Sequence, residues 1–344
     1  MKAMVINKIC NIFNETPLSL VDIPIPNIND DEILIKVNTC GVCHTELDEI
    51  EGRTPPSSLP MIPGHQVVGK VVKKGKNVTL FKIGDRVGVG WIFSACGNCE
   101  FCQKGLENLC KDFKATGRDA NGGYAEYMKI NENYAVKLPN NFSDEEAAPL
   151  LCAGAIGYRS LKLANIENGM NLGLTGFGAS AHLVLKLVKH LYPDTKIFVF
   201  ARNPKERQFA LDLGAIWSGD ITDNSPKLLH AIIDTTPVWK PIVEALKNLT
   251  PAGRLVINAI RKENIDKNYL LNLTYERDLW FEKELKSVAN VTISDIKEFV
   301  EIASKANIKP IYQTYTLKEA NLALKELKSK KIKGAKVIKI NENN

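Results

Sequence analysis

The sequence predicts two domains of different class, an all-β barrel and a doubly wound α/β domain with a parallel sheet. Residues 1–140 contain short alternating apolar runs that Gly and Pro interrupt, which is typical of β-strands. From about residue 143, apolar strands alternate with amphipathic helices, the order of βαβ units. The 344-residue chain is long for one hydrophobic core and sufficient for two.

The first part of the chain predicts strands joined by tight turns. The stretch "EILIKVNTC" (32–40) alternates apolar and polar residues, as a half-buried strand does. Residues 65–93 read as several strands separated by glycine turns. Because no helical period separates these strands, we expect a small barrel in this part of the chain.

The second part begins with a helix signal at Ser143-x-x-Glu146, a capping box. The strands "MNLGLTGFG", "KIFVFAR", "AIIDTT" and "GRLVINAI" then alternate with the helices "ASAHLVLKLVKHL" and "PKERQFALDLGA". The last 50 or so residues predict two amphipathic helices, the second starting at the capping box Thr316-x-x-Glu319, and a final strand "GAKVIKI". A parallel, doubly wound sheet follows from this alternation.

Composition and charge favour an ordinary globular protein that binds neither nucleic acid nor membrane. The chain is 44% hydrophobic and 24% charged, with a net charge of +6. A run of lysines near the C-terminus is interpreted as a solvated face (Lys325, Lys328, Lys330, Lys331, Lys333, Lys336, Lys339). No signal peptide and no apolar run of about 18 residues is present, so we expect the cytoplasm.

Eight cysteines are present, and in a reducing compartment clustered cysteines more often bind metal than form disulfides. The segment "CGNCEFCQKGLENLC" places four of them at spacings x2, x2 and x7 (Cys96, Cys99, Cys102, Cys110). Four thiolates that converge within one short loop predict a closed structural zinc site. An iron–sulfur cluster or incidental cysteines are the alternatives.

A catalytic zinc needs three protein ligands and one position for water or substrate. The candidates are Cys43, His65 and Cys152, with Cys40 and Cys10 as rivals. Spacing alone does not choose among them, because they come from separate elements. A redox disulfide between Cys40 and Cys43 is a minor alternative.

A glycine turn joins the first strand and helix of the α/β part. It reads G-x-G-x-x-A from Gly176 to Ala181, follows a strand and opens a helix, as a dinucleotide-binding turn does. We expect the phosphates of the dinucleotide to meet the backbone of this turn and of the first helical residues (Gly176, Phe177, Gly178, Ala179, Ser180).

The end of the second strand bears on the choice of cofactor. NAD sites usually place Asp or Glu there, whereas this chain has Ala201 followed by Arg202. No carboxylate is available to repel a 2′-phosphate, and Arg202 can pair with one bidentately. NADP is therefore the expected cofactor and NAD the alternative, with Arg207 either assisting or solvated.

Seven segments occur in the order found in the zinc-dependent medium-chain alcohol dehydrogenases: "GVCHTE", "PGHQVVG", "GDRVGVGW", "CGNCEFC…C", "GGYAEY", "LLCAGAIGY" and "GFGASAHLV". The chain resembles this family along nearly its whole length, and most closely the bacterial branch that oxidises small primary alcohols. The resemblance implies a GroES-like catalytic domain that contains both zinc ions, at residues 1–152 plus 291–344. It also implies a Rossmann domain at 153–290, with the active site in the cleft between the two.

Residue by residue, the resemblance makes Cys43, His65 and Cys152 the ligands of the catalytic zinc. Cys40 becomes a buried thiol near the site, and Cys10 a small core or strand residue. Further residues take the family's roles: Thr45 accepts the proton of the alcohol, His44 lies against the cofactor pyrophosphate, Glu46 orients the zinc-bound histidine, Asp48 occupies the end of the proton relay, and Trp91 lines the substrate pocket. Core packing is the alternative for Trp91.

The chain departs from the family pattern at four positions. Gln66 replaces a Glu, Glu46 is one methylene longer than the usual Asp, Asp48 replaces a relay histidine, and Ile156 replaces a threonine near the nicotinamide. These changes put the relay and the rate in doubt, because an Asp has a pKa poorly matched to proton transfer at pH 7. None of them removes a zinc ligand.

The expected function is oxidation of small primary alcohols, or reduction of the aldehydes, with two zinc ions per chain and NADP as cofactor. Relatives suggest a homodimer or a homotetramer. A cinnamyl-type or polyol dehydrogenase is the alternative within the family. A zinc and nucleotide-binding protein whose relay has decayed is the alternative outside catalysis, and a nucleic-acid-binding zinc ribbon would leave the glycine turn unexplained.

Overall fold

The computed structural model describes residues 1–329 and 334–340, which form two compact units. The first unit comprises Met1–Ala155 and Val291–Asn344, and the second comprises Ile156–Asn290. The α/β unit is thus inserted into the chain of the β-rich unit. The resemblance implies boundaries at 152/153 and 290/291, and the structure divides into units at 155/156 and 290/291.

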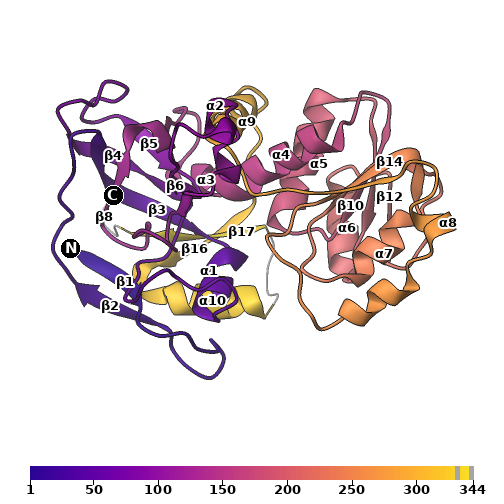
Figure 1. Cartoon of the computed structure of the whole chain (residues 1–344), viewed down its shortest axis with the longest axis horizontal. Coiled ribbons are helices and arrows are strands. Elements are labelled where there is room, and N and C mark those ends of the chain that lie inside the picture. Colours follow the sequence, from indigo (N-terminus) through magenta and orange to yellow (C-terminus); the bar gives the residue numbers. More distant parts are fainter. Residues whose placement is uncertain (330–333, 341–344) are drawn as a thin grey trace. The chain divides into compact units, whose positions relative to one another are not determined.

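A seven-stranded sheet forms the centre of the first unit (Figure 1). Its strands run in the order β16-β17-β3-β4-β5-β9, and β8 also pairs with β3. Only β16 and β17 are parallel neighbours. The strands are β3 (Glu32–Val42), β4 (Val67–Lys74), β5 (Arg86–Val89), β8 (Tyr127–Asn131), β9 (Ala135–Lys137), β16 (Tyr312–Thr316) and β17 (Ala335–Lys339).

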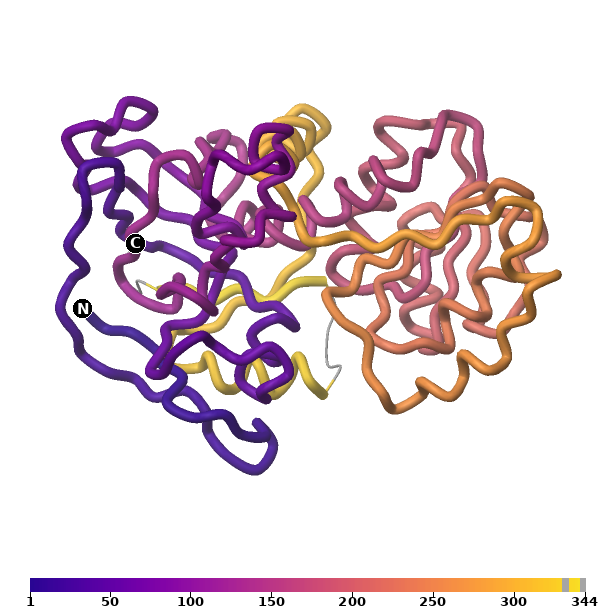
Figure 2. Tube along the Cα trace, viewed as in Figure 1, coloured from indigo at the N-terminus to yellow at the C-terminus, as the bar shows by residue number. Residues whose placement is uncertain are grey.

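Strand β3 pairs with strands from both the N-terminal and the C-terminal segments of the first unit. Its first half pairs with β8, its last residues pair with β17, and its other edge pairs with β4. Figure 2 shows the yellow C-terminal trace entering among the indigo N-terminal strands. The buried side chains of these strands form the core of the unit, including Ile33, Ile35, Val67, Val87 and Ile338.

Smaller elements cover this sheet. They are the hairpin β1 (Lys2–Ile6) and β2 (Leu18–Asp22), the pair β6 (Ile92–Ser94) and β7 (Lys114–Ala115), the helices α1 (His44–Ile50), α2 (Glu100–Gln103), α3 (Asp144–Pro149), α9 (Ile293–Lys305) and α10 (Ala320–Lys328), and 3₁₀ turns at Glu107–Leu109, Glu132–Tyr134 and Leu317–Glu319. Both predicted capping boxes are confirmed, at Ser143 with Glu146 and at Thr316 with Glu319.

The helix predicted after Ser143 is interrupted. It consists of α3, a π-helical turn at Leu150–Gly154 and α4 (Ala155–Ala164). Pro149 ends α3, and its ring nitrogen has no hydrogen to donate to the preceding turn. The wider π turn changes the direction of the side chains that follow, and such turns often occur at functional sites.

The second unit contains a six-stranded parallel sheet in the order β12-β11-β10-β13-β14-β15. The strands are β10 (Asn171–Thr175), β11 (Lys196–Phe200), β12 (Trp217–Gly219), β13 (Leu229–Asp234), β14 (Leu249–Ile257) and β15 (Glu284–Ser287); the helices are α4, α5 (Ala179–Leu191), α6 (Pro204–Asp212), α7 (Lys240–Leu246) and α8 (Tyr275–Asp278), with a 3₁₀ turn at Lys267–Asn272. The order reverses between β10 and β13, so the predicted doubly wound fold is confirmed.

The expected solvated lysine face is wrong at Lys336. Lys336 is buried and its ammonium donates to Glu326 at 2.7 Å and to the Tyr315 hydroxyl. Lys328 pairs with Glu51, and Lys339 lies 3.3 Å from Glu145. Lys330, Lys331 and Lys333 lie outside the described residues. Within 1–329 and 334–340, no helix is both long and apolar enough to cross a membrane.

Candidate active site

Three side chains from distant parts of the sequence meet in the first unit. Cys43 follows β3, His65 precedes β4 and Cys152 lies in the π turn. One ligand atom of each lies within 4.8 Å of the other two. His65 Nε2 is 3.2 Å from Cys152 Sγ. The structure therefore brings together the three residues that the resemblance assigned to the catalytic zinc.

Glu46 holds two of these residues in place. Cys43 is the N-cap of α1, and its backbone N–H donates to Glu46 Oε2 at 2.7 Å in a capping box. Glu46 Oε1 lies 2.7 Å from His65 Nδ1, so Nε2 of that ring is the nitrogen directed at Cys152. The longer Glu side chain thus serves as helix cap and as support for the histidine.

The π turn places Cys152 against the sheet. Next to it, Gly154 lies so close to α9 that an added Cβ would come within 2.1 Å of the Phe299 ring. Leu151 likewise packs against the backbone of Gly88. A buried, close-packed turn of this kind holds the cysteine rigidly, as a metal ligand requires.

Thr45 and Trp91 lie beside the cluster. Thr45 is buried, and its Oγ1 is 3.6 Å from Cys43 Sγ. The Trp91 ring packs edge-on against His65, with ring centres 5.1 Å apart, and Phe113 stacks on it at 6.4 Å. Trp91 is 3% exposed. The ring of Trp91 therefore packs beside His65 and is also part of the protein core.

Two other predicted residues of α1 differ in their surroundings. His44 is exposed at the first position of the helix. Asp48 is buried, and its Oδ1 accepts a hydrogen bond from Arg53 Nε at 2.6 Å. The ion pair with Arg53 holds the Asp48 side chain in one orientation.

The electrostatics distinguish the two cysteines of the C-x-x-C pair. A hydrogen bond from Cys152 lowers the pKa of Cys43 well below its usual value, against the effect of burial, and His65 lowers it further. Burial lowers the pKa of His65, but Glu46 and Cys43 raise it more, so the net shift is well upward. Burial raises the pKa of Cys40 well above its usual value. The pKa values of the two thiols in the C-x-x-C pair are therefore shifted in opposite directions.

Cys40 and Cys10 are not part of the ligand cluster. Both are free thiols, as is Cys43, so no disulfide joins Cys40 to Cys43 in this structure. Cys40 is buried in β3 under the backbone of Gly64 and Gly123. Cys10 is buried in the loop after β1, so of the two expected roles, core or strand residue, the structure shows a core residue.

Two of the residues that differ from the family pattern, Gln66 and Ile156, pack against neighbouring residues. Gln66 is buried with its side chain against Gly41, where an added Cβ would come within 2.7 Å of it. Ile156 is half-buried, and its carbonyl accepts a hydrogen bond from Ser160 Oγ at 2.7 Å and from Asn258 Nδ2 at 3.4 Å. Gln66 is thus part of the core, and Ile156 is partly buried and hydrogen-bonded through its carbonyl.

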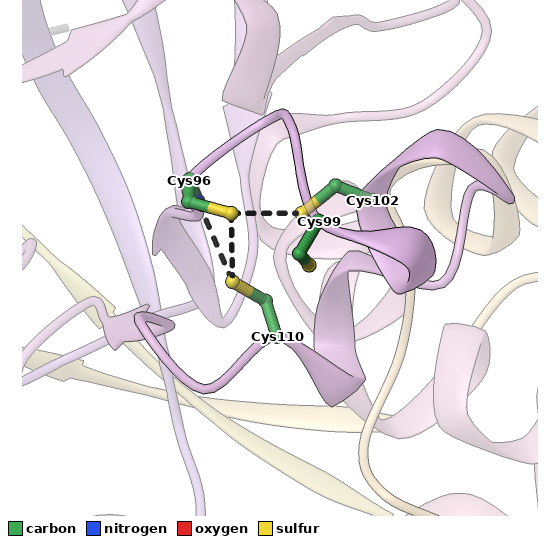
Figure 3. A group of neighbouring side chains, drawn as sticks. All are labelled: Cys96, Cys99, Cys102 and Cys110. Carbon is green, nitrogen blue, oxygen red and sulfur yellow. Dashed lines mark hydrogen bonds between the residues drawn. The ribbon is translucent and has the colours of Figure 1, made fainter.

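The second cluster is the four-cysteine lobe (Figure 3). The Cys96 sulfur lies 3.5 Å from that of Cys110 and 3.9 Å from that of Cys102. Sulfurs at the corners of a zinc tetrahedron with bonds of about 2.3 Å would be about 3.8 Å apart. Backbone N–H groups of Asn98 and Cys99 lower the pKa of Cys96 to about 6.

Hydrogen bonds fix this lobe to the rest of the unit. Glu107 Oε1 accepts from the N–H of Ile293 at the start of α9, at 2.6 Å. The Tyr134 hydroxyl accepts from the N–H of Ala95 at 3.0 Å. These contacts at both ends of the lobe agree with a structural role.

In the second unit, the predicted glycine turn joins β10 to α5. Gly176 has φ +75°, which favours glycine, and a Cβ there would meet Thr235 Oγ1 at 2.9 Å. Gly178 is the N-cap of α5, and a Cβ there would meet nothing within 4 Å. Phe177 is buried against Phe209, at 5.5 Å between ring centres, so only its backbone faces the turn. Ala179 and Ser180 begin the helix.

The end of β11 has the predicted arrangement of side chains. Ala201 is buried and Arg202 is exposed, and Asn203 caps α6 by accepting from the N–H of Lys205. Arg207 is neither free nor fully solvated. Its guanidinium lies 3.2 Å from Asp220 Oδ2 and donates to the Ala201 carbonyl at 3.3 Å.

Sequence reasoning missed a buried ionic cluster across the switch point between β10 and β13. Asp234 Oδ1 accepts from Thr175 at 2.5 Å and from the Thr236 hydroxyl at 2.8 Å. The buried ammonium of Lys262 pairs with the other Asp234 oxygen and donates to the Thr236 carbonyl at 2.5 Å. An Asp at the end of an apolar strand was visible in the sequence, but its lysine partner, 28 residues later, carried no signal.

Two buried polar groups behind His65 were also missed. Glu49 lies one helical turn after Glu46, and its two oxygens have no hydrogen-bond partner among the described residues. Burial raises its pKa well above the usual value, and the neighbouring Glu46 raises it further. The Tyr124 hydroxyl is likewise buried and unpaired in the described structure. The position of Glu49 on the Glu46 face of α1 was the available signal.

Comparison with known proteins agrees with this geometry. Residues 29–140 match the family model "Alcohol dehydrogenase GroES-like domain". The chain is 39% identical to "Probable alcohol dehydrogenase AdhA" of Mycobacterium tuberculosis over 94% of this chain and 93% of that protein. It is 36% identical to a "Probable cinnamyl alcohol dehydrogenase" of Populus deltoides over 67% of this chain and 68% of that protein.

A solved structure agrees over the whole chain. The crystal structure of CAD from Helicobacter pylori complexed with NADP(H) superposes with a TM-score of 0.87 at 26% identity, covering 100% of this chain and 99% of that one. Together with the relative at 39% identity, this likeness extends over both units. The chain therefore belongs to the zinc-dependent medium-chain alcohol dehydrogenases and is an oxidoreductase.

Proposed function

We propose that this protein interconverts small primary alcohols and their aldehydes, with zinc at the Cys43 cluster and NADP(H) as the hydride carrier. The observation that carries the proposal is the cluster itself, with three nitrogen and sulfur ligands and the Thr45 hydroxyl 3.6 Å from one of them. Three protein ligands are the mark of a catalytic zinc, because the fourth position is kept for water or substrate.

Two zinc ions per chain are proposed from the two clusters. One set has two thiolates and an imidazole, and the other has four thiolates, which are ligand sets that zinc prefers. The sulfur separations in the second set are close to those of a zinc tetrahedron. Because free thiols and thiolate ligands persist in reducing compartments, we place the protein in the cytoplasm.

Each residue in or beside the cluster has a separate role. A zinc ion held by Cys43, His65 and Cys152 would supply a Lewis acid for the alcohol oxygen, and a nicotinamide held at the glycine turn would supply the hydride acceptor. Thr45 accepts the hydroxyl proton of the substrate and can pass it on, because a hydroxyl is both donor and acceptor. Glu46 keeps the His65 ring in one orientation, and Trp91 fills the space beside that ring.

The preference for NADP(H) is proposed from the residues after β11. Buried Ala201 offers no carboxylate, and exposed Arg202 is available to pair with a 2′-phosphate. Arg207 contributes by binding the Ala201 carbonyl and Asp220, which holds the loop in place. The Helicobacter pylori structure, which contains NADP(H), lends support by likeness.

A cinnamyl-type substrate is the second candidate, favoured by the relative from Populus deltoides. The buried Trp91 argues against it, because a large ring beside the metal ligands leaves less room for an aromatic substrate. Substrate size therefore separates the two candidates.

We also propose a homodimer formed through strand β15. This edge strand pairs only with β14 among the described residues, and all four of its residues are exposed. Trp280, Phe281 and Leu285 expose 46–59% of their surface at or just before it. Phe281 has φ +67°, an unusual conformation for a bulky residue and one that is often found at functional positions.

Zinc content should distinguish Cys43 from Cys40, the two cysteines of the C-x-x-C motif. Wild-type protein is expected to contain about two zinc ions per chain by mass spectrometry, and Cys43→Ser about one, because one of three ligands is lost. Cys40→Ser is the control and should keep about two. Equal metal content in wild type and Cys43→Ser would contradict a zinc site at Cys43.

Turnover should depend on the Thr45 hydroxyl as the proton acceptor. Wild type should oxidise short primary alcohols faster than cinnamyl alcohol when NADPH formation is followed by absorbance. Thr45→Val should lower kcat about 10²- to 10⁴-fold while zinc content is unchanged, because the proton has lost its acceptor. Thr45→Ser, which keeps the hydroxyl, is the control. If wild type bound NADPH and zinc but turned over no alcohol, the protein would instead be a binding protein.

Arg202 should determine the preference for NADP over NAD. Arg202→Ala should raise KM for NADP about 10- to 100-fold and change KM for NAD little, because a charge-assisted pair is worth about 1.5–3 kcal/mol. Lys205→Ala, which removes a neighbouring charge in the first turn of α6, should have a smaller effect. An equal rise for NAD and NADP in Arg202→Ala would show that Arg202 does not read the 2′-phosphate.

The assembly prediction uses light scattering to measure mass in solution. Wild type should have the mass of a dimer, and the double variant Trp280→Asp with Leu285→Asp that of a monomer, because buried charges oppose association. The control Ile83→Asp changes an exposed apolar residue of the other unit and should leave the dimer intact. A dimer that persists in the double variant would place the interface elsewhere.

A further inference from the structure

His182 is a buried histidine directly behind the glycine turn. It lies in the first turn of α5 and is 0% exposed. Burial lowers its pKa to about 4, so the ring is neutral at pH 7. An apolar side chain in this position would avoid the cost of burying an imidazole, so the presence of histidine calls for a physical reason.

The ring is bonded to the turn itself. His182 Nδ1 lies 3.1 Å from the carbonyl oxygen of Gly178, and the backbone N–H of His182 donates to the same oxygen at 3.2 Å. A carbonyl oxygen only accepts, so Nδ1 carries the hydrogen. In the neutral ring Nε2 is then a bare acceptor, and it has no partner in the described structure. The ring thus directs its donor at the Gly178 carbonyl, with a further contribution from the backbone of Ala179.

That bond fixes the direction of the next N–H group. The peptide between Gly178 and Ala179 is planar and trans, so its C=O and its N–H point in opposite directions. Two donors from His182 hold the C=O toward the helix interior. The Ala179 N–H must then point out of the helix N-terminus, the direction in which a helix binds phosphate.

Glycine makes this restraint necessary. Gly178 leaves open space where a Cβ would stand, so a ligand can approach its backbone. The same residue has the freest backbone in the turn, and a free peptide can rotate away from a ligand. Phe209 of α6 packs on the His182 ring at 6.2 Å and on Phe177 at 5.5 Å, which holds the imidazole in place.

We propose that His182 is a positioning residue for the cofactor pyrophosphate, which it serves by holding the Gly178–Ala179 peptide with its N–H directed at the phosphates. The proposal rests on the proposed function, since it requires that the turn binds a nicotinamide dinucleotide. His182 acts through the backbone of Gly178 and does not itself touch the ligand.

The test uses two substitutions that differ in one property. In Asn the side-chain Nδ2 is as many bonds from the backbone as Nδ1 is in His, so His182→Asn keeps a donor for Gly178. His182→Leu places a methyl group there and removes the donor. The dissociation constant of NADPH is measured for wild type and both full-length variants by fluorescence titration, and the thermal midpoint is measured alongside.

His182→Leu should bind NADPH about tenfold more weakly than wild type, and His182→Asn within about threefold of wild type. The thermal midpoint of His182→Leu should equal or exceed that of wild type, because Leu needs no hydrogen-bond partner when it is buried. Weaker binding in a protein that is no less stable separates positioning from a general structural role.

Three results would overturn the proposal. Unchanged affinity in His182→Leu would show that the bond to Gly178 does not matter for binding. Equally weak binding by the Leu and Asn variants would show that the donor is not the reason. If wild type bound neither NADPH nor NADH, the proposed function would fail as well, whereas the first two results leave it standing.

Discussion

The short contacts of Glu46 are the constraint on which the metal cluster depends. One carboxylate oxygen accepts the N–H of Cys43 and the other lies 2.7 Å from His65 Nδ1, so a single side chain sets two of the three ligands. The contact with His65 is fully buried and the one with Cys43 is partly buried, and separating charged or polar groups in such surroundings is costly. The helix cap and the ligand geometry are therefore one structure, and neither can change without the other.

Features that are local in the sequence could be predicted from it. The four-cysteine lobe spans 15 residues, and the glycine turn and both capping boxes are shorter still. In each, the residues that interact are those that the chain places side by side. The fold class followed in the same way, because strand and helix periods are properties of short windows.

Features that depend on distant contacts could not be predicted from the residues alone. Cys43, His65 and Cys152 were joined by family resemblance, since no spacing relates three separate elements. The π turn that carries Cys152 interrupts a segment with an ordinary helical pattern, and only packing against α9 reveals it. The pairing of Lys262 with Asp234 and the burial of Lys336 likewise follow from tertiary structure, against the usual exposure of lysine.

The insertion of one unit into the other has a consequence for synthesis on the ribosome. Strand β17 pairs with the end of β3, the residues that lead directly to Cys43, yet almost 300 residues separate the two strands. A nascent chain can complete the whole α/β unit before β17 has been made. The central sheet of the other unit stays open at this edge until residues 335–339 have been synthesised, and the free edge of β3 must avoid other partners during that time.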